Sequence, residues 1–305
     1  MKTYLDCMPC FAQQALDAVS MATDDPDLRL RVMHQVLRAM SDFPLDSSPL
    51  QMAARIHNLI RQETGDPDPY IEVKERANAA ALEMMPRLLE RVTRSADPFE
   101  TALRMAIAGN IMDWGARHHT QLSDQVVEET IEQTLEAPIR GCSVEEFRQE
   151  LQAAGAVLYL ADNAGEIVFD SLFISFVPCK NITVAVKGGP TINDATMADA
   201  EQIGLSAQVR VLSTGSDMPG TVLDDCSDEF REQFGSADLI IAKGQANYEA
   251  LSEREGPIYL LLKAKCPVIA RDIGCEVGDT LLLGPRTGDS APMSATEEVA
   301  QDARL

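Results

Sequence analysis

The chain has 305 residues, of which 45% are hydrophobic and 24% charged, as is ordinary for a soluble globular protein of one or two domains. Its formal net charge of -22 at pH 7 would repel phosphate backbones, so we expect no nucleic-acid partner. No apolar run approaches the roughly 18 residues of a membrane span. The N-terminus also lacks the apolar core of a signal peptide, so we expect a cytoplasmic protein that binds no membrane.

The first 148 residues are expected to form a helical domain. Apolar residues recur there at helical spacing, and segments that contain Pro, Gly or acidic residues interrupt the pattern. Pro86 is expected to kink or restart one of these helices. The predicted helices cover residues 11–21, 27–40, 50–63, 70–94, 98–114 and 123–135.

Beyond residue 148, short apolar runs alternate with helical stretches. Continuous apolar runs are typical of strands buried on both faces, and the alternation predicts βαβ units. We therefore expect an α/β domain with a largely parallel sheet over residues 149–285, followed by a mobile polar tail over 286–305. The predicted strands cover residues 156–161, 182–187, 209–213, 239–242, 258–262, 268–271 and 280–283.

Asp162 and Asn163 stand at the carboxyl end of the first predicted strand, before a predicted helix over residues 167–177. In open α/β sheets, ligands bind at this edge. A carboxylate beside an amide oxygen is a ligand pair that hard divalent cations prefer. The alternative is that either residue caps the following helix, with Glu166 completing a capping box.

A second acidic turn, residues 187–196, follows the next predicted strand. Asp194 in this turn could complete a cation site with the first turn, because such turns can face each other across neighbouring strand ends. Its two glycines would let backbone amides approach a phosphate, and Lys187 could supply positive charge. The alternative is a solvated loop in which Asn193 or Asp194 caps a helix.

Two later strand ends carry lysines. Lys243 follows the predicted strand 239–242 and could neutralise a phosphate, although the surrounding residues do not form a GxxxxGK loop. Asn247 could donate a hydrogen bond to a substrate hydroxyl. Lys263 ends the apolar run 258–262, where a lysine is seldom only a surface residue.

Asn110 and Asp113 stand out in the helical half. They are three residues apart, so they share one helix face and could reach a substrate across the cleft between the domains. The alternative is an ordinary helix end with polar caps.

The seven cysteines are an odd and scattered set, which argues against a disulfide framework. Only Cys7 and Cys10 form a CxxC pair. Packing, metal binding and redox chemistry all stay open for that pair.

Taken together, these motifs resemble the damage-control phosphatases first catalogued as domain of unknown function eighty-nine, in the archaeal and bacterial branch that has an N-terminal CxxC. The motifs span nearly the whole chain, and their order makes the match specific. The matching stretches are Cys7 with Cys10, Asn110 with Asp113, and residues 162–166, 193–196, 243–249 and 262–267.

The resemblance implies a helical domain packed on a Rossmann-like three-layer α/β/α domain, with a metal ion in the cleft. It implies metal ligands at Asp162, Asn163 and Asp194, and phosphate contacts from Lys263 and Lys243. Members of that family hydrolyse small phosphorylated metabolites such as sugar phosphates, with Mn²⁺, Co²⁺, Ni²⁺ or Mg²⁺. Of the Arg-Thr-x-Lys pattern in the eukaryotic branch, only Lys263 is present here.

We therefore predict metal-dependent hydrolysis of small phosphomonoesters by a metal-activated water. Asp162, Glu166 and Lys263 are the predicted catalytic residues, with Glu166 moving a proton or orienting the water and Lys263 offsetting charge on the phosphoryl group. The predicted substrate-binding residues are Asn110, Asp113, Lys187, Lys243 and Asn247.

Two other functions stay open. The same residues could form a metal-dependent module that binds a phosphometabolite without turnover. Carboxyl methyl transfer from S-adenosylmethionine is disfavoured, because the acidic turn after the first strand would repel the carboxylate of that cofactor. The oligomeric state is left open.

Overall fold

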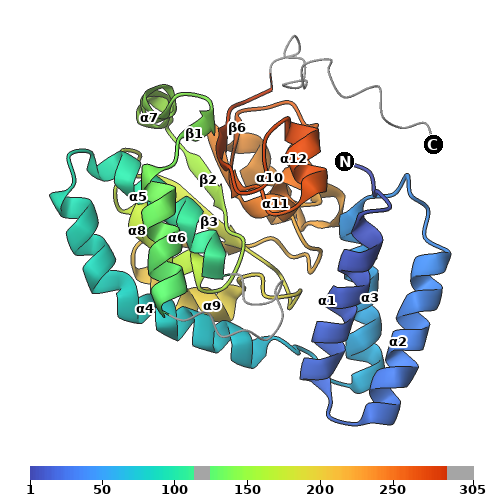
Figure 1. Cartoon of the computed structure of the whole chain (residues 1–305). Coiled ribbons are helices and arrows are strands. Elements are labelled where there is room, and N and C mark those ends of the chain that lie inside the picture. Colours follow the sequence, from blue (N-terminus) through green and yellow to red (C-terminus); the bar gives the residue numbers. More distant parts are fainter. Residues whose placement is uncertain (113–123, 287–305) are drawn as a thin grey trace.

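The structure is a computed structural model that describes residues 1–112 and 124–286. Figure 1 shows a central sheet with helices on both faces and a bundle of three helices standing beside it. Among the described residues, no helix is long and apolar enough to cross a membrane. The predicted tail lies outside the described residues except for Arg286, and so does the predicted substrate residue Asp113.

The sheet contains seven strands within the described residues: β1 (Ile139–Gly141), β2 (Val157–Leu160), β3 (Ile182–Val186), β4 (Arg210–Ser213), β5 (Leu239–Lys243), β6 (Ile258–Lys263) and β7 (Thr280–Leu283). Their order across the sheet is β1-β7-β6-β5-β2-β3-β4. Each neighbouring pair from β6 to β4 is parallel, whereas β7 runs antiparallel to β6. The predicted α/β class with a largely parallel sheet is confirmed.

Two strand assignments differ from the prediction. The strand predicted over residues 268–271 is wrong, because these residues lie in the helix α12 (Pro267–Ile273). Pro267 occupies its first turn and Gly274, at φ 82°, ends it, which are the usual boundary signals of a helix. The strand β1 comes from the segment predicted to be helical, and its three residues are too few and too exposed to form an apolar run.

Helices α1 (Cys7–Ala22), α2 (Pro26–Ser41) and α3 (Pro49–Thr64) form the bundle beside the sheet. The bundle has an apolar core of its own, to which Ile192 from the turn after β3 also packs. Ile192 has φ 45°, a conformation that a β-branched residue rarely adopts. The bundle is therefore joined to the loop that carries Asp194.

The remaining helices cover the sheet. One face carries α4 (Ile71–Arg94), α5 (Pro98–Ala108), α6 (Asp124–Glu136), α7 (Val144–Ala153), α8 (Glu166–Ile174) and α9 (Met197–Gln202). The other carries α10 (Asp228–Ser236), α11 (Gly244–Leu251) and α12. A 3-10 turn, η1 (Gly109–Met112), follows α5. Pro86 lies inside α4, which continues through it as one helix.

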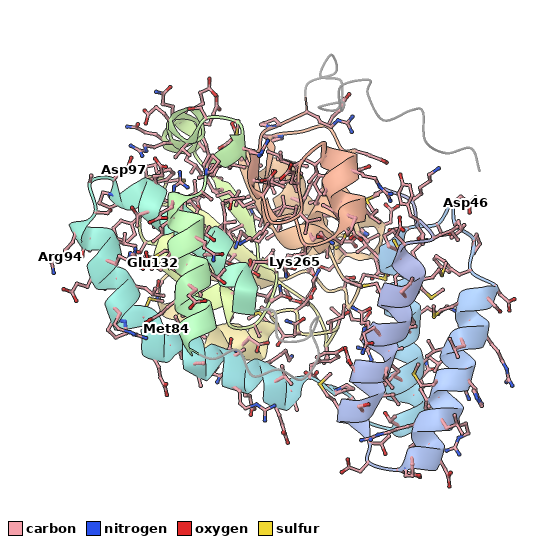
Figure 2. The ribbon with its side chains drawn as sticks, viewed as in Figure 1. Asp46, Met84, Arg94, Asp97, Glu132 and Lys265 are labelled. Carbon is pink, nitrogen blue, oxygen red and sulfur yellow. The ribbon has the colours of Figure 1, made fainter. Side chains whose placement is uncertain are left out.

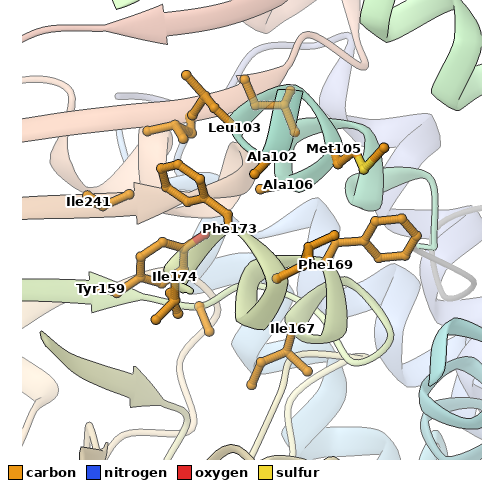
Figure 3. Packing of buried hydrophobic residues seen from close by; sticks show 14 of the residues in the cluster. Ala102, Leu103, Met105, Ala106, Tyr159, Ile167, Phe169, Phe173, Ile174 and Ile241 are labelled. Carbon is orange, nitrogen blue, oxygen red and sulfur yellow. The ribbon is translucent and has the colours of Figure 1, made fainter. Parts of the chain in front are cut away.

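The two faces of the sheet follow the alternation of each strand. In β2, Val157 and Tyr159 face the core with α5 and α8, whereas Leu158 and Leu160 face the core with α10 to α12. Figure 3 shows Tyr159 beside Phe173 of α8, next to the small residues of α5. The segment predicted as one helical domain therefore contributes both to the core of the bundle and to a core of the sheet.

Figure 2 labels Arg94 on α4 and Glu132 on α6, and charged pairs join these two helices. Arg87 pairs with Glu128, and Arg91 pairs with Glu132 across the same two helices. Exposed pairs of this kind contribute little to stability, and they place no charge at the carboxyl edge of the sheet.

Candidate active site

The carboxyl ends of β2, β3, β5 and β6 lie at one edge of the sheet. The chain leaves β2 toward β3 and β4 and later returns on the other side as β5 and β6, so β2 and β5 flank a topological switch point. Ligands bind at such points in open α/β sheets. Predicted site residues end or follow all four strands: Asp162 and Asn163, Lys187, Lys243, and Lys263.

The turn after β2 brings two carboxylates and two amides together. Asn163 Nδ2 donates to Asp162 Oδ2 at 2.8 Å and to Glu166 Oε2 at 3.0 Å. Asn110, which reaches in from η1, donates through Nδ2 to the same two oxygens at 3.2 and 2.7 Å. All four side chains are buried. The predicted first turn and Asn110 are thus parts of one cluster.

The turn after β3 lies directly against the turn after β2. Asn163 and Asp194 form an isolated antiparallel bridge, and the Ala195 N–H donates to the Asp162 carbonyl oxygen at 2.8 Å. Lys187 Nζ lies 3.5 Å from Asp194 Oδ2 and also donates to the Gly220 carbonyl oxygen. The structure therefore places Asp162, Asn163 and Asp194 side by side.

Beneath these turns lies a buried polar chain centred on Lys243, whose side chain is 0% exposed. Its Nζ donates to Glu166 Oε1 at 2.8 Å, to Asp170 Oδ1 at 2.5 Å and to the Ala106 carbonyl oxygen at 2.9 Å. The Tyr159 hydroxyl donates to the same Asp170 oxygen at 2.7 Å. Lys243 therefore fixes one oxygen of Glu166, while the amides of Asn110 and Asn163 fix the other.

The pKa values of the side chains bonded around Lys243 reflect both their burial and the charges of their neighbours. Burial raises the pKa of Asp170 to about 6, although the Lys243 ammonium group opposes the rise. Burial alone would lower the pKa of Lys243, but Asp170 and Glu166 outweigh it and raise that pKa above its usual range. Burial and the nearby Asp170 carboxylate raise the pKa of Tyr159. The two carboxylates therefore favour the charged form of Lys243 inside the protein.

The charge of the cluster suits a divalent cation. Among the described residues, its buried carboxylates are Asp162, Glu166, Asp170 and Asp194, and its buried ammonium groups are Lys187 and Lys243. A divalent cation would offset negative charge in this buried site, where unpaired charge is costly. Asn110 Oδ1 is buried without a hydrogen-bond partner among the described residues, so one more oxygen acceptor is available.

The donor set is one of hard oxygens. No group of three or more His, Cys, Asp or Glu side chains is arranged for metal binding in residues 1–112 and 124–286. An ion here would therefore rest on the carboxylates of Asp162 and Asp194, the amide oxygen of Asn163, and ligands from water or substrate. Mg²⁺ and Ca²⁺ sites are commonly of this mixed kind.

Gly244 begins α11, and its close contact with Asp162 requires a glycine at this position. It has φ 79°, and a Cβ atom on it would lie 1.7 Å from Asp162 Oδ2. The Asp162 carboxylate therefore lies against the first turn of α11, where the helix dipole favours negative charge.

Three of the predicted substrate-binding residues are buried and bonded within the protein. Lys187 and Lys243 have the contacts given above. Asn247 donates through Nδ2 to the Lys243 carbonyl oxygen at 2.8 Å and accepts from the Thr221 hydroxyl at 2.8 Å. Lys263 is half-buried at the end of β6. Direct contact of these residues with a substrate stays a prediction.

Sequence reasoning missed Asp170, Tyr159 and Asn78, a buried residue of α4 whose Oδ1 accepts from the Gly165 N–H in the turn after β2. Asp170 lies four residues after Glu166 on α8, where every residue is buried, so an acid inside an otherwise apolar helix was the available signal. Tyr159 lay inside an apolar strand, and Asn78 lay in an alanine-rich helix. Neither local sequence indicates a partner.

Cys7 and Cys10 belong to the helical bundle, whereas Cys226 lies near enough to Lys187 for that ammonium group to oppose the rise of its pKa that burial causes. All seven cysteines are free, in agreement with the prediction from their odd number. Cys7 and Cys10 lie in the first turn of α1, where burial raises the pKa of Cys7 and Cys10 is exposed. A raised pKa makes the reactive thiolate scarcer.

Comparisons with known proteins agree with the resemblance seen in the motifs. The family model described as the damage-control phosphatase ARMT1-like domain matches residues 3–281. A damage-control phosphatase of Archaeoglobus fulgidus is 37% identical over 281 residues, which cover 90% of this chain and 96% of that protein. A damage-control phosphatase of Pyrococcus horikoshii is 35% identical over 284 residues, covering 91% and 96% of the two chains.

A solved structure matches the fold as well. The crystal structure of a protein from Pyrococcus horikoshii, described as a member of the family of domain of unknown function eighty-nine, superposes with a TM-score of 0.83. The match covers 94% of this chain and 100% of that chain, at 33% sequence identity.

Proposed function

This chain belongs to the damage-control phosphatase ARMT1-like domain family, and we propose that it is a phosphatase of small phosphorylated metabolites that works with a divalent metal ion. Phosphatase activity is supported by the names of relatives that match over nearly their whole length. Sugar phosphates and related phosphomonoesters are the proposed substrates. Mn²⁺, Co²⁺, Ni²⁺ and Mg²⁺ are the ions to test.

The observation that carries the metal requirement is the meeting of Asp162, Asn163 and Asp194 at the switch point of the sheet. These three residues would hold the ion. When bound, such an ion polarises a phosphoryl oxygen and lowers the pKa of a bound water. The gathering of buried carboxylates in the cluster supports the same requirement.

Glu166 is proposed to act as a positioning residue. Its two carboxylate oxygens accept from Lys243, Asn110 and Asn163, and its side chain is 0% exposed. A carboxylate bonded on both oxygens is poorly placed to receive a proton from water. It does hold the two amides in the orientation that the site requires.

Lys263 is proposed to bind the phosphoryl group. It lies at the carboxyl end of β6 and is the least buried of the three strand-end lysines. An ammonium group near the phosphate would offset negative charge that develops on its oxygens during hydrolysis. Asn110 is proposed to contact either the ion or the substrate, because its buried Oδ1 has no hydrogen-bond partner in the part of the chain that the structure describes.

The test is release of inorganic phosphate from a panel of sugar phosphates, nucleotides and 4-nitrophenyl phosphate. The protein is first treated with a chelator and then assayed alone and with each of the four ions. The variant Asp194→Ala removes a proposed ligand. The matched control is Asp238→Asn, because Asp238 is an exposed carboxylate at the opposite, amino end of the strands.

Release that returns with a metal in the wild type and the control, but not in Asp194→Ala, is the expected result. Turnover by Asp194→Ala at normal metal concentration would remove Asp194 from the proposed ligands. If the metal-loaded wild type binds sugar phosphates in calorimetry but releases no phosphate, the chain is a binding module instead.

A further inference from the structure

A second buried polar cluster lies where α4 packs against the two site turns. Its centre is Asn78 of α4, which is 0% exposed. Asn78 Oδ1 accepts from the Gly165 N–H at 2.6 Å, and its Nδ2 donates to Asp199 Oδ1 at 3.0 Å and to Gln202 Oε1 at 2.7 Å. Every hydrogen-bonding direction of this amide but one is therefore used.

These contacts reach both site turns at once. Gly165 lies between Asn163 and Glu166 in the turn after β2. Asp199 Oδ2 accepts from the backbone N–H of Thr196 at 2.8 Å and from its hydroxyl at 2.7 Å, two residues beyond Asp194. One side chain on α4 thus connects the turn of Asp162 and Asn163 with the turn of Asp194.

The surroundings of Asn78 hold it in place. Gly165 has φ 77°, and a Cβ atom on it would lie 3.0 Å from the Ala77 Cβ, so α4 packs closely on that turn. Lys74, one turn earlier on α4, lies 2.7 Å from Asp68 Oδ2 and 3.7 Å from Asp199 Oδ2 and is 2% exposed. Lys74 thereby offsets the charge of the buried Asp199.

We propose that Lys74, Asn78 and Asp199, here called the α4 clamp, are positioning residues that set the spacing between Asp162 with Asn163 on one turn and Asp194 on the other. This inference rests on the proposed metal site at those residues. Outer residues that orient metal ligands typically contribute about 10- to 100-fold in metal affinity or activity. The clamp meets the two turns at the Gly165 N–H and at Thr196, so it acts through the segments that carry the proposed ligands.

The test is Mn²⁺ binding by Asn78→Asp, measured by calorimetry without substrate. This change keeps an oxygen that can accept from Gly165 but places a carboxylate against Asp199. We expect the dissociation constant for Mn²⁺ to rise about 10- to 100-fold. Asp238→Asn is the control, since Asp238 accepts from the N–H groups of Gly155 and Ala156 at the other end of β2, and its Mn²⁺ affinity should not change.

A reciprocal exchange provides the rescue. In Asn78→Asp combined with Asp199→Asn, the amide and the carboxylate trade places, so a donor again faces an acceptor at unchanged net charge. We expect Mn²⁺ affinity to return toward the wild-type value. An Asn78→Asp protein that is folded and binds Mn²⁺ as tightly as wild type would overturn the proposal, as would a double variant that folds but shows no recovery.

Amide hydrogen exchange separates failure of the clamp from failure of the metal site. Without any metal, Asn78→Asp should lose protection in both segments 162–166 and 194–197, and the double variant should regain it. Loss in one segment alone would overturn the clamp. A wild type that binds no Mn²⁺ but shows the paired loss in the variant would instead overturn the proposed metal site.

Discussion

Lys243 and Lys263 end neighbouring parallel strands, yet the structure gives them different surroundings. Lys243 of β5 is fully buried and donates to Glu166 and Asp170, whereas Lys263 of β6 is half-buried. The register explains the difference, because Lys243 lies opposite Leu261, so Lys263 extends two residues farther along the same direction. At a rise of about 3.3 Å per residue, that is about 7 Å beyond the level of Lys243.

The comparison teaches that a lysine at a strand end can either support a site from below or face a ligand. Lys243 neutralises the carboxylates that orient the site, and removing it should mainly affect folding. Lys263 lies closer to the surface, and removing it should mainly affect phosphate release. Four predictions test this division, from the largest expected change in free energy to the smallest.

The largest effect is expected for Lys243→Met. This change leaves Glu166 and Asp170 buried without the ammonium group that they bind. Because removal of one partner of a buried ion pair costs about 3–5 kcal/mol, we expect the free energy of unfolding to fall by about that amount. Urea unfolding followed by circular dichroism measures the change. Lys180→Met is the matched control, because Lys180 is an exposed lysine before β3 and should change stability by less than about 0.5 kcal/mol. Equal stability of the two variants would refute the supporting role of Lys243.

The second-largest effect is expected on kcat for phosphate release, in the variant Lys263→Ala. Lys263→Ala should lower kcat for phosphate release on the order of 10²–10³-fold, about 3–4 kcal/mol of activation free energy, because a charge next to the developing oxyanion is lost. Its urea midpoint should stay close to that of wild type. Steady-state kinetics beside Lys180→Ala would check this. A rise in KM alone, with kcat unchanged, would show that Lys263 binds the ground state only.

The third prediction is a pH dependence that belongs to Asp170. Burial raises its pKa from 3.8 to about 6, so the folded protein holds this proton more tightly than the unfolded chain does. The contribution of Asp170 to the free energy of unfolding is therefore fully present below about pH 4 and is lost as the pH rises through about 6. At about 1.4 kcal/mol per pKa unit, the loss amounts to up to about 3 kcal/mol. The difference in unfolding free energy between wild type and Asp170→Asn should fall over that range. A difference that is constant with pH would contradict the raised pKa.

The smallest effect is expected for Tyr159→Phe. The change removes one hydrogen bond to Asp170, which keeps its bond to Lys243, so the cost should be about 1–2 kcal/mol. Thermal unfolding at pH 7 measures it, and kcat should be unchanged in the folded protein. A loss of turnover larger than the loss of stability would place Tyr159 closer to the chemistry than the structure indicates.

The amino-acid sequence was sufficient to predict the parts of the site that lie at strand ends. Asp162, Asn163 and Asp194 were predictable neighbours, because their turns follow two apolar runs and the carboxyl ends of parallel strands meet at one edge. Helix positions were predictable because the apolar spacing and the capping residues of a helix lie within its own segment of the sequence. The prediction failed for residues 268–271, where three apolar residues followed by Arg271 are too short a run to distinguish a strand from a helix.

The grouping of polar residues into buried clusters became visible only in the folded chain. The burial of Lys243 depends on the register of β5 with β6 and on the packing of α5 above it, neither of which the local sequence contains. Asn78 meets Gly165 and Asp199 across 87 and 121 positions of the chain. Such contacts depend on how the helices pack on the sheet. Packing of the apolar cores determines which elements lie against a polar side chain, and these elements supply its partners.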